Sequence, residues 1–303
     1  MADRALAVVD AHQRPEGYAV PSATYPYRWL WDSAFHAVVR AALGQPDKAA
    51  AELRFAHRHQ HPSGFVAHID HVSDPDAFAA FWGRAGDSTI TQPPVSGHAV
   101  AELARVTGAV DERLAIAAAA HLRFCFGRRH PSGLPAVAHP WETGCDDSPR
   151  WDHWGAADPA RWFTVKGELV AGLRIDTAGA AVGSAVAGFD CAPVGFAAIC
   201  AWSARQLLAV APGIDDTLAA EADAVAEALR GRWDPARRCW VDAGAHEATS
   251  GCTRTVEALL PLLVEDRPEV CATVLAELAD PAAWAGRYGP RGVHPAEPAY
   301  DPG

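Results

Sequence analysis

The stretch His61-Pro62-Ser63-Gly64-Phe65 recurs in this chain as His130-Pro131-Ser132-Gly133-Leu134. Each copy follows a pair of segments whose apolar residues recur at three- and four-residue spacing, which is typical of amphipathic helices. These pairs cover residues 30–60 and 92–127, and a third pair ends in the related sequence Trp233-Asp234-Pro235. The repeat therefore indicates units made of a helix, a tight turn, a second helix and a longer loop.

Helical periodicity extends through most of the chain, whereas the alternation expected of strands is almost absent. Clusters of Gly, Pro and Asp separate consecutive segments and predict tight turns between antiparallel helices. The expected helices lie near residues 3–12, 30–43, 46–60, 92–107, 111–127, 194–210, 215–232, 252–264 and 268–279. The long loops of such units are expected to gather at one end of the assembly.

Stacked helical hairpins form either an open solenoid or a closed ring. The tryptophan-rich loops favour the ring, because indole rings need a common funnel to cover them. The sequence thus predicts an all-α fold, an (α/α)6 toroid, as one catalytic-type domain over residues 1–303. About nine helices are expected where six hairpins have twelve, and the chain stops in the loop-like sequence Tyr300-Asp301-Pro302-Gly303. We therefore expect an incomplete ring that lacks its last hairpins, and its exposed apolar faces favour a homo-oligomer.

Composition limits the classes of partner. Half of the 303 residues are apolar, and the formal net charge of −11 is spread along a chain without a basic run. This excludes nucleic acid and an anionic membrane surface as expected partners. No apolar stretch approaches the roughly 18–20 residues that span a bilayer. The seven cysteines lack zinc-site spacing, and we expect a soluble, cytoplasmic protein.

Residues 139–152 read His-Pro-Trp-Glu-Thr-Gly-Cys-Asp-Asp-Ser-Pro-Arg-Trp-Asp, without a helical or strand period. This composition is typical of a catalytic loop that binds sugars. Carboxyl groups protonate a glycosidic oxygen or bind hydroxyls, indole faces stack on pyranose rings, and glycine lets the backbone turn. A solvated acidic turn is the alternative, but two uncovered indoles are unfavourable in such a turn.

Four segments together resemble one family. They are Tyr25-Pro26-Tyr27-Arg28-Trp29-Leu30-Trp31-Asp32-Ser33-Ala34-Phe35-His36, Thr91-Gln92-Pro93-Pro94, the loop 139–152, and Tyr300-Asp301-Pro302. In this order they resemble the bacterial mannosylglycerate and glucosylglycerate hydrolases, relatives of processing α-glucosidase I. The resemblance implies an (α/α)6 barrel and inverting hydrolysis of an α-glucosidic or α-mannosidic bond in a small glycoside such as glucosylglycerate or mannosylglycerate. It implies a small carbohydrate as the partner, with no metal and no organic cofactor.

The resemblance assigns roles around the acidic loop. Asp146 matches the general acid of the family, which must be protonated before it donates to the leaving group. Asp147 and Arg150 are expected to set the orientation and charge of this acid, and Trp141 to stack on the sugar. Asp147, Arg150 and Trp141 are thus the substrate-binding residues predicted in this loop.

Other substrate-binding residues are expected elsewhere in the chain. Tyr25 and Trp31 are candidates for stacking, and Asp32 and Gln92 for binding hydroxyls. Asp32 is alternatively a helix N-cap. Arg174, in an Arg-x-Asp-Thr sequence, is expected to meet a hydroxyl or a glycerate carboxylate, and a plain surface arginine is the alternative. The region 174–195 is shorter than in the family, which leaves the choice of sugar open.

The second carboxylate of an inverting pair is not identified by the sequence. Such a base lies about 6.5–9.5 Å from the acid and activates water, and in the family it is a glutamate downstream of the Tyr-Asp-Pro loop. Glu247, Glu257 and Glu297 lie in no matching context. The alternative function is therefore a non-catalytic carbohydrate-binding remnant of such an enzyme.

A metal-dependent hydrolase is a further alternative, suggested by histidines 57, 59, 61, 68 and 71. Only His57 and His61 share a helical face, and the glutamate of a His-Glu-x-x-His motif is absent between them. Histidines that cap carbonyl groups or face solvent at a helix end explain the cluster without a metal.

Overall fold

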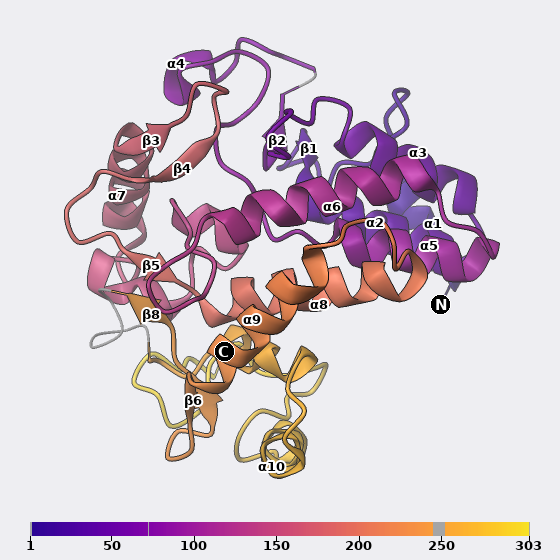
Figure 1. Ribbon diagram of the computed structural model, residues 1–303. Coiled ribbons are helices and arrows are strands. Elements are labelled where there is room, and N and C mark those ends of the chain that lie inside the picture. The colour runs from indigo at the N-terminus through magenta and orange to yellow at the C-terminus, as the bar shows by residue number, and fades with distance from the viewer. Residues whose placement is uncertain (1, 72, 245–251, 303) are drawn as a thin grey trace. The chain divides into compact units, whose positions relative to one another are not determined.

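The computed structural model describes residues 2–71, 73–244 and 252–302 (Figure 1). The chain forms two compact units. The first comprises residues 1–127, 174–182 and 202–220, and the second comprises residues 128–173, 183–201 and 221–303. Long helices dominate the regular structure, and the strands are two to four residues long. The predicted helical character is confirmed.

Most predicted helices form close to their expected bounds. They are α1 (Ala2–Ala11), α2 (Leu30–Ala42), α3 (Pro46–Ala56), α5 (Ser96–Thr107), α6 (Glu112–Gly127), α8 (Val194–Val210), α9 (Leu218–Arg230) and α10 (Pro268–Ala279). The remaining helical elements are α4 (Ala79–Trp82), α7 (Pro159–Ala171) and the 3-10 helices η1 (Pro140–Thr143), η2 (Pro149–Trp154) and η3 (Val256–Leu263). The strands are β1 (Arg28–Trp29), β2 (Ile69–Asp70), β3 (Leu173–Ile175), β4 (Ala181–Ser184), β5 (Cys191–Ala192), β6 (Trp233–Asp234), β7 (Cys239–Trp240) and β8 (Ala243–Gly244).

In the first unit, α2 packs against α3 and α5, and α5 packs against α6. The face of α2 that these helices cover carries Leu30, Ala34, Ala37 and Ala41, at spacings of three and four residues. Alanine on this face lets the helix axes approach closely. Another close approach is at Gly97 of α5, where an added Cβ would lie 2.7 Å from the Ser203 carbonyl oxygen of α8.

The two copies of the sequence repeat form the same turn. In the first, the backbone N–H of His61 donates to the Phe65 carbonyl (2.9 Å), and Gly64 donates back to His61 (2.8 Å). In the second, His130 donates to Leu134 (2.9 Å) and Gly133 donates to His130 (2.9 Å). In both copies the histidine Nδ1 accepts a bond from the serine backbone two residues later. The repeat is therefore structural.

The third copy differs. Trp233 and Asp234 form strand β6, which pairs antiparallel with β7. The Asp234 carboxylate accepts bonds from the backbone N–H groups of Ala236 and Arg237, at 2.9 and 3.1 Å. An aspartate that bonds its own downstream backbone closes this hairpin, so the histidine turn is replaced by an Asx turn.

Two helical predictions need correction in the second unit. Residues 252–264 were expected to form an α-helix, but a 3-10 helix forms over Val256–Leu263, with Pro261 inside it. Proline lacks the N–H that an α-helix interior requires. No helix was expected near α7, although Asp158 caps it by accepting from Ala160 and Arg161 at 3.1 and 3.3 Å, and Pro159 occupies its first turn. The Asp-Pro pair was a readable start signal.

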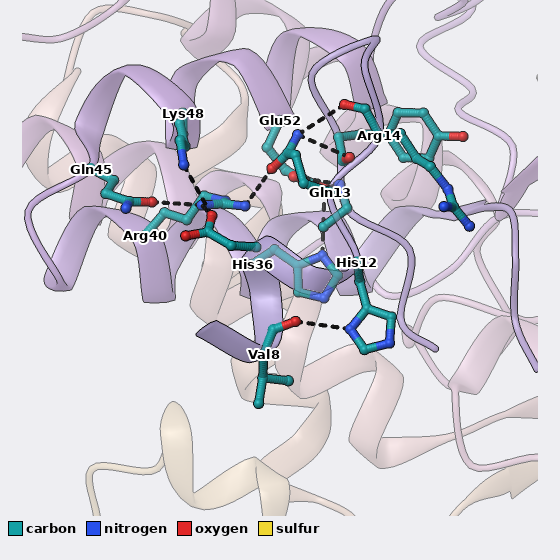
Figure 2. Close-up of polar contacts among 12 residues, drawn as sticks. Val8, His12, Gln13, Arg14, His36, Arg40, Gln45, Lys48 and Glu52 are labelled. Carbon is teal, nitrogen blue, oxygen red and sulfur yellow. Dashed lines mark hydrogen bonds and ion pairs between the residues drawn. The ribbon is translucent and has the colours of Figure 1, made fainter. Parts of the chain in front are cut away.

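Helix α1 is attached to the first unit largely through polar contacts, and none of its described residues is fully buried. Arg40, whose side chain is fully buried, binds Asp10, Gln13 and Gln45, and Figure 2 shows Arg40 with its partners Gln13 and Gln45. Nearby, both carboxylate oxygens of Glu52 accept from the backbone N–H of Ala19, at 3.1 and 2.9 Å. The guanidinium of Arg40 thus connects three segments at the start of the chain.

Among the described helices, none combines the length and the apolar character needed to span a lipid bilayer.

The shared turn generates a stability prediction. Gly64 has φ +89°, and an added Cβ would lie 2.0 Å from the Ala120 carbonyl oxygen. Gly44 has φ +81° but open space around it. We expect Gly44→Ala to lose about 1–2 kcal/mol through backbone strain alone, and Gly64→Ala to lose more than about 3 kcal/mol because of the overlap. Denaturant unfolding measures both, and equal losses would contradict the packing described.

The polar attachment of α1 generates a second prediction. Arg40→Met removes the buried donor that Asp10, Gln13 and Gln45 share, so we expect a clear fall in melting temperature. Lys48→Met is the matched control, since Lys48 contacts the same Asp10 carboxylate at 3.0 Å from an exposed position, where ion pairs contribute little. Calorimetric scans of both variants test this, and a larger effect at Lys48 would refute it.

Candidate active site

The residues expected in the site fall into two groups, one in each unit. Asp146, Asp147, Arg150 and Trp141 belong to the second unit. Tyr25, Trp31, Asp32, Gln92 and Arg174 belong to the first. Each group is described by itself.

In the second unit, the two neighbouring aspartates of the acidic loop share one cation. The Lys166 ammonium lies 2.9 Å from Asp146 Oδ2 and 2.9 Å from Asp147 Oδ1. The side chain of Asp146 is 24% exposed and that of Asp147 is 78% exposed. Although burial alone would lower the pKa of Lys166, its bonds to the two carboxylates raise that pKa above its ordinary value.

Indole rings surround this charged cluster. The Lys166 ammonium lies 5.6 Å from the Trp141 ring centroid and 5.5 Å from that of Trp162. The Trp162 Nε1–H donates to the Asp146 carbonyl (2.8 Å) and to Asp147 Oδ1 (3.1 Å). Trp141 was expected to stack on the sugar. Its ring lies beside the lysine that binds Asp146, and the stacking itself stays a prediction. Lys166 and Trp162, four residues apart on α7, were missed.

The backbone of the loop is fixed by side chains. The buried His139 ring accepts from the Trp141 N–H at Nδ1 (3.1 Å), so its Nε2–H donates to the Lys166 carbonyl (3.0 Å). Burial lowers the pKa of His139 to about 3, which keeps the ring neutral. The Trp151 indole N–H donates to the Cys145 carbonyl at 3.0 Å. These bonds satisfy polar groups in a segment that has only 3-10 turns.

Arg150 forms a buried ion pair with Asp242. Its Nε donates to Asp242 Oδ2 (2.9 Å), and its NH1 donates to the Thr253 carbonyl (3.3 Å). The other oxygen of Asp242 accepts from the Val194 backbone (2.8 Å). Burial alone would lower the pKa of Arg150, but the Asp242 charge and bonds raise it. Arg150 therefore supports the loop, and its effect on the acid stays a prediction.

Two glutamates considered as a second carboxylate are described by the structure. Glu257, on η3, accepts a bond from the Ser148 hydroxyl, and burial together with Glu257 and Asp146 raises the pKa of Cys145 to about 12. Glu257 thus lies near the acidic loop. Glu297 pairs with Arg254 at 2.6 Å. Glu247 lies outside the described residues.

In the first unit, Gln92 and Trp31 are in contact. The Gln92 side-chain oxygen accepts from the Trp31 backbone N–H at 3.2 Å, and Gln92 is buried. The N-cap of α2 is Trp29, so the N-cap alternative for Asp32 is wrong and Asp32 lies in the first turn. Burial raises the pKa of Asp32 above its ordinary value, despite the opposing charge of His36.

Aromatic rings cluster around the same strand-to-helix junction. Tyr25 is 52% exposed and meets the edge of the Trp29 ring at 5.4 Å. His68 lies between Trp29 and Trp82, at 5.5 and 5.4 Å. Trp29 and Trp82 were not among the expected site residues. Arg174, on β3, is exposed, which agrees with the alternative that it is a plain surface arginine. Its contact with substrate stays a prediction.

The histidines that suggested a metal have other partners. His57 Nε2 lies 3.0 Å from the Ser96 hydroxyl, and His61 Nδ1 lies 3.1 Å from that of Ser63. His68 contacts Ser88 at 2.5 Å. Burial lowers the pKa of His57 to about 3. In residues 2–71, 73–244 and 252–302, no group of three or more His, Cys, Asp or Glu side chains has an arrangement that holds a metal ion.

A hollow of about 530 Å³ lies elsewhere in the second unit. It is lined by Trp233, Pro235, Arg238, Glu269, Val270, Thr273 and Ala276. None of the expected site residues is among them, so this hollow is separate from the acidic loop.

Solved structures show the fold. The chain aligns over its full length with 82% of the GH63 mannosylglycerate hydrolase from Thermus thermophilus in complex with Tris and D-glycerate, with a TM-score of 0.80 and 24% identity. The glucose complex of the same protein gives a TM-score of 0.77 and 25% identity over 81% of that chain. The predicted (α/α)6 toroid class is confirmed.

Curated relatives match part of the chain. A mannosylglycerate hydrolase of Selaginella moellendorffii is 38% identical over 154 residues, 45% of this chain and 31% of the relative. A mannosylglycerate hydrolase of Thermus thermophilus is 33% identical over 171 residues, 49% of this chain and 40% of the relative. A glucosylglycerate hydrolase of Mycolicibacterium hassiacum is 33% identical over 156 residues, 42% of this chain and 34% of the relative. The chain thus matches well under half the length of these relatives.

A family model describes almost the whole chain. The mannosylglycerate hydrolase MGH1-like glycoside hydrolase domain matches residues 25–303, which includes every residue that the sequence assigned to the site. The chain therefore belongs to the mannosylglycerate hydrolase MGH1-like glycoside hydrolase family.

Proposed function

We propose that this protein is a glycoside hydrolase that cleaves the α-glycosidic bond of a small anionic glycoside, such as mannosylglycerate or glucosylglycerate. The observation that carries the proposal is the cluster of Asp146, Asp147 and Lys166 beside the Trp141 and Trp162 rings. It combines an acid with the partly exposed ring of Trp141, an apolar surface of the kind that stacks on sugars, while the buried Trp162 supports the cluster. The names of the relatives support the substrate class.

In the proposed reaction, Asp146 donates a proton to the glycosidic oxygen as the bond to the anomeric carbon breaks. A water molecule, deprotonated by a second carboxylate, attacks the opposite face of the sugar, so the configuration inverts. Glu257 lies near the loop but is engaged by Ser148, and we assign the base to neither Glu257 nor Glu297. Trp31, Gln92, Asp32 and Tyr25 are the proposed sugar-binding residues of the first unit.

The role of Asp146 is testable by Asp146→Asn. Asparagine preserves the shape but cannot donate the proton, so we expect kcat to fall by about 100- to 10,000-fold, while sugar binding measured by calorimetry remains. Asp158→Asn is the matched control, because asparagine caps a helix as aspartate does. The substrates are α-mannosylglycerate, α-glucosylglycerate, kojibiose and trehalose. Retained turnover in Asp146→Asn would remove Asp146 from its role.

Two further measurements on the native chain test the stereochemistry of the reaction and the alternative function. Proton NMR of the first product formed from an α-glycoside should show the β-anomer if the reaction inverts. A chain that binds these sugars in calorimetry and releases no monosaccharide would instead be a carbohydrate-binding remnant. Rapid appearance of the α-anomer would contradict inversion.

A further inference from the structure

Lys166 places a lysine, a rare residue in this chain, beside the acidic loop. Lys48 and Lys166 are the only lysines in a chain of 26 basic residues. Lys166 lies on α7, one turn after Trp162, and its side chain is 10% exposed. Unlike a guanidinium, an ammonium is a compact point charge. Here it lies 2.9 Å from one oxygen of each of two carboxylates.

The ammonium is held in place from two sides. The Trp141 and Trp162 ring centroids lie 5.6 and 5.5 Å from it, within the range of cation–π attraction. The neutral His139 ring donates to the Lys166 carbonyl at 3.0 Å, which fixes the backbone that carries the lysine. A lysine anchored in this way has little freedom to leave its carboxylates.

The balance of charge at Asp146 follows from this arrangement. A cation in hydrogen-bond contact favours the ionised carboxylate, whereas a neighbouring carboxylate favours the protonated one. Lys166 and Asp147 therefore act on Asp146 in opposite directions, and Asp147 also shares the cation. The loop and the side chains that bind it contain further charged or titratable groups: His139, Cys145, Asp152, Glu257, and the ion pairs Arg128–Glu142 and Arg150–Asp242.

We propose that Lys166 is a positioning residue that, together with Asp147, sets the pH at which the Asp146 carboxyl group holds its proton. This inference rests on the proposed function only because that function assigns the proton to the leaving group. Lys166 fixes the direction of the carboxyl group and favours its ionised form, and Asp147 weakens that effect by sharing the ammonium. Removing Lys166 shifts proton loss from Asp146 to higher pH, and removing the charge of Asp147 shifts it to lower pH.

The test is a titration of the full chain by ¹³C NMR of the aspartate side-chain carboxyl carbons, with the Asp146 signal assigned by its absence in Asp146→Asn. We expect the midpoint for Asp146 to rise by about one pH unit or more in Lys166→Met. It should stay near the native value in Lys166→Arg, which keeps the positive charge. It should fall in Asp147→Asn.

Lys48→Met is the matched control, because it removes the only other lysine, which contacts Asp10 in the first unit. It should leave the Asp146 midpoint unchanged. An unchanged midpoint in Lys166→Met, or a rise in Asp147→Asn, would overturn the proposal. If Lys166→Met loses its fold by circular dichroism, the nearly isosteric Asp147→Asn variant still decides the question by the direction of its change.

Hydrolysis assays separate this inference from the proposed function. The titration needs no substrate, so midpoints that move as expected in a chain without activity contradict only the hydrolase proposal. An active chain in which the Asp146 midpoint is the same in all variants contradicts only the role of Lys166. Where the chain is active, the fall of kcat/KM at high pH should shift to higher pH in Lys166→Met, because a general acid works in its protonated form. If Lys166 only supported the structure, Lys166→Met would lower activity without shifting the pH at which kcat/KM falls.

Discussion

Two buried ion pairs hold the loop that carries Asp146, one on each side of it in the sequence. Before it, Arg128 binds Glu142 at 2.6 Å, and the other oxygen of Glu142 accepts from the Ala138 backbone. After it, Arg150 binds Asp242. The segment between Glu142 and Arg150 lacks the regular hydrogen bonds of a long helix or a sheet. Buried ion pairs replace them, at a desolvation cost that only good geometry offsets.

This constraint explains why the acidic residues of the loop have different roles. Glu142 is fully buried and structural, whereas Asp147 is 78% exposed. Asp146 lies between these extremes, with part of its surface open and its backbone held by Trp162. A carboxyl group that must exchange protons needs both access and a fixed position, and the loop provides them at one residue.

The sequence predicted the helical hairpins and the recurrence of a histidine segment after two of them, because each depends on residues close together in the chain. The role of Asp146 stays a prediction. The sequence did not predict Lys166 or Trp162, which contact Asp146 from α7, twenty and sixteen residues further along the chain. The Asp158-Pro159 start signal would have revealed that helix, and spacing would then have placed both side chains on one face. The short strands β1 and β2 depend on pairing between residues 28–29 and 69–70, which local periodicity does not reveal.

The histidine turn has a consequence for how this architecture diversifies. Because each copy is closed by its own backbone and serine contacts, the hydrogen bonds that define the turn do not depend on the residues that follow it. Residues that follow such a turn can lengthen, shorten or change in composition without unravelling the helices before it. The helical scaffold can thus stay constant while the adjoining loops change in sequence and bind other ligands.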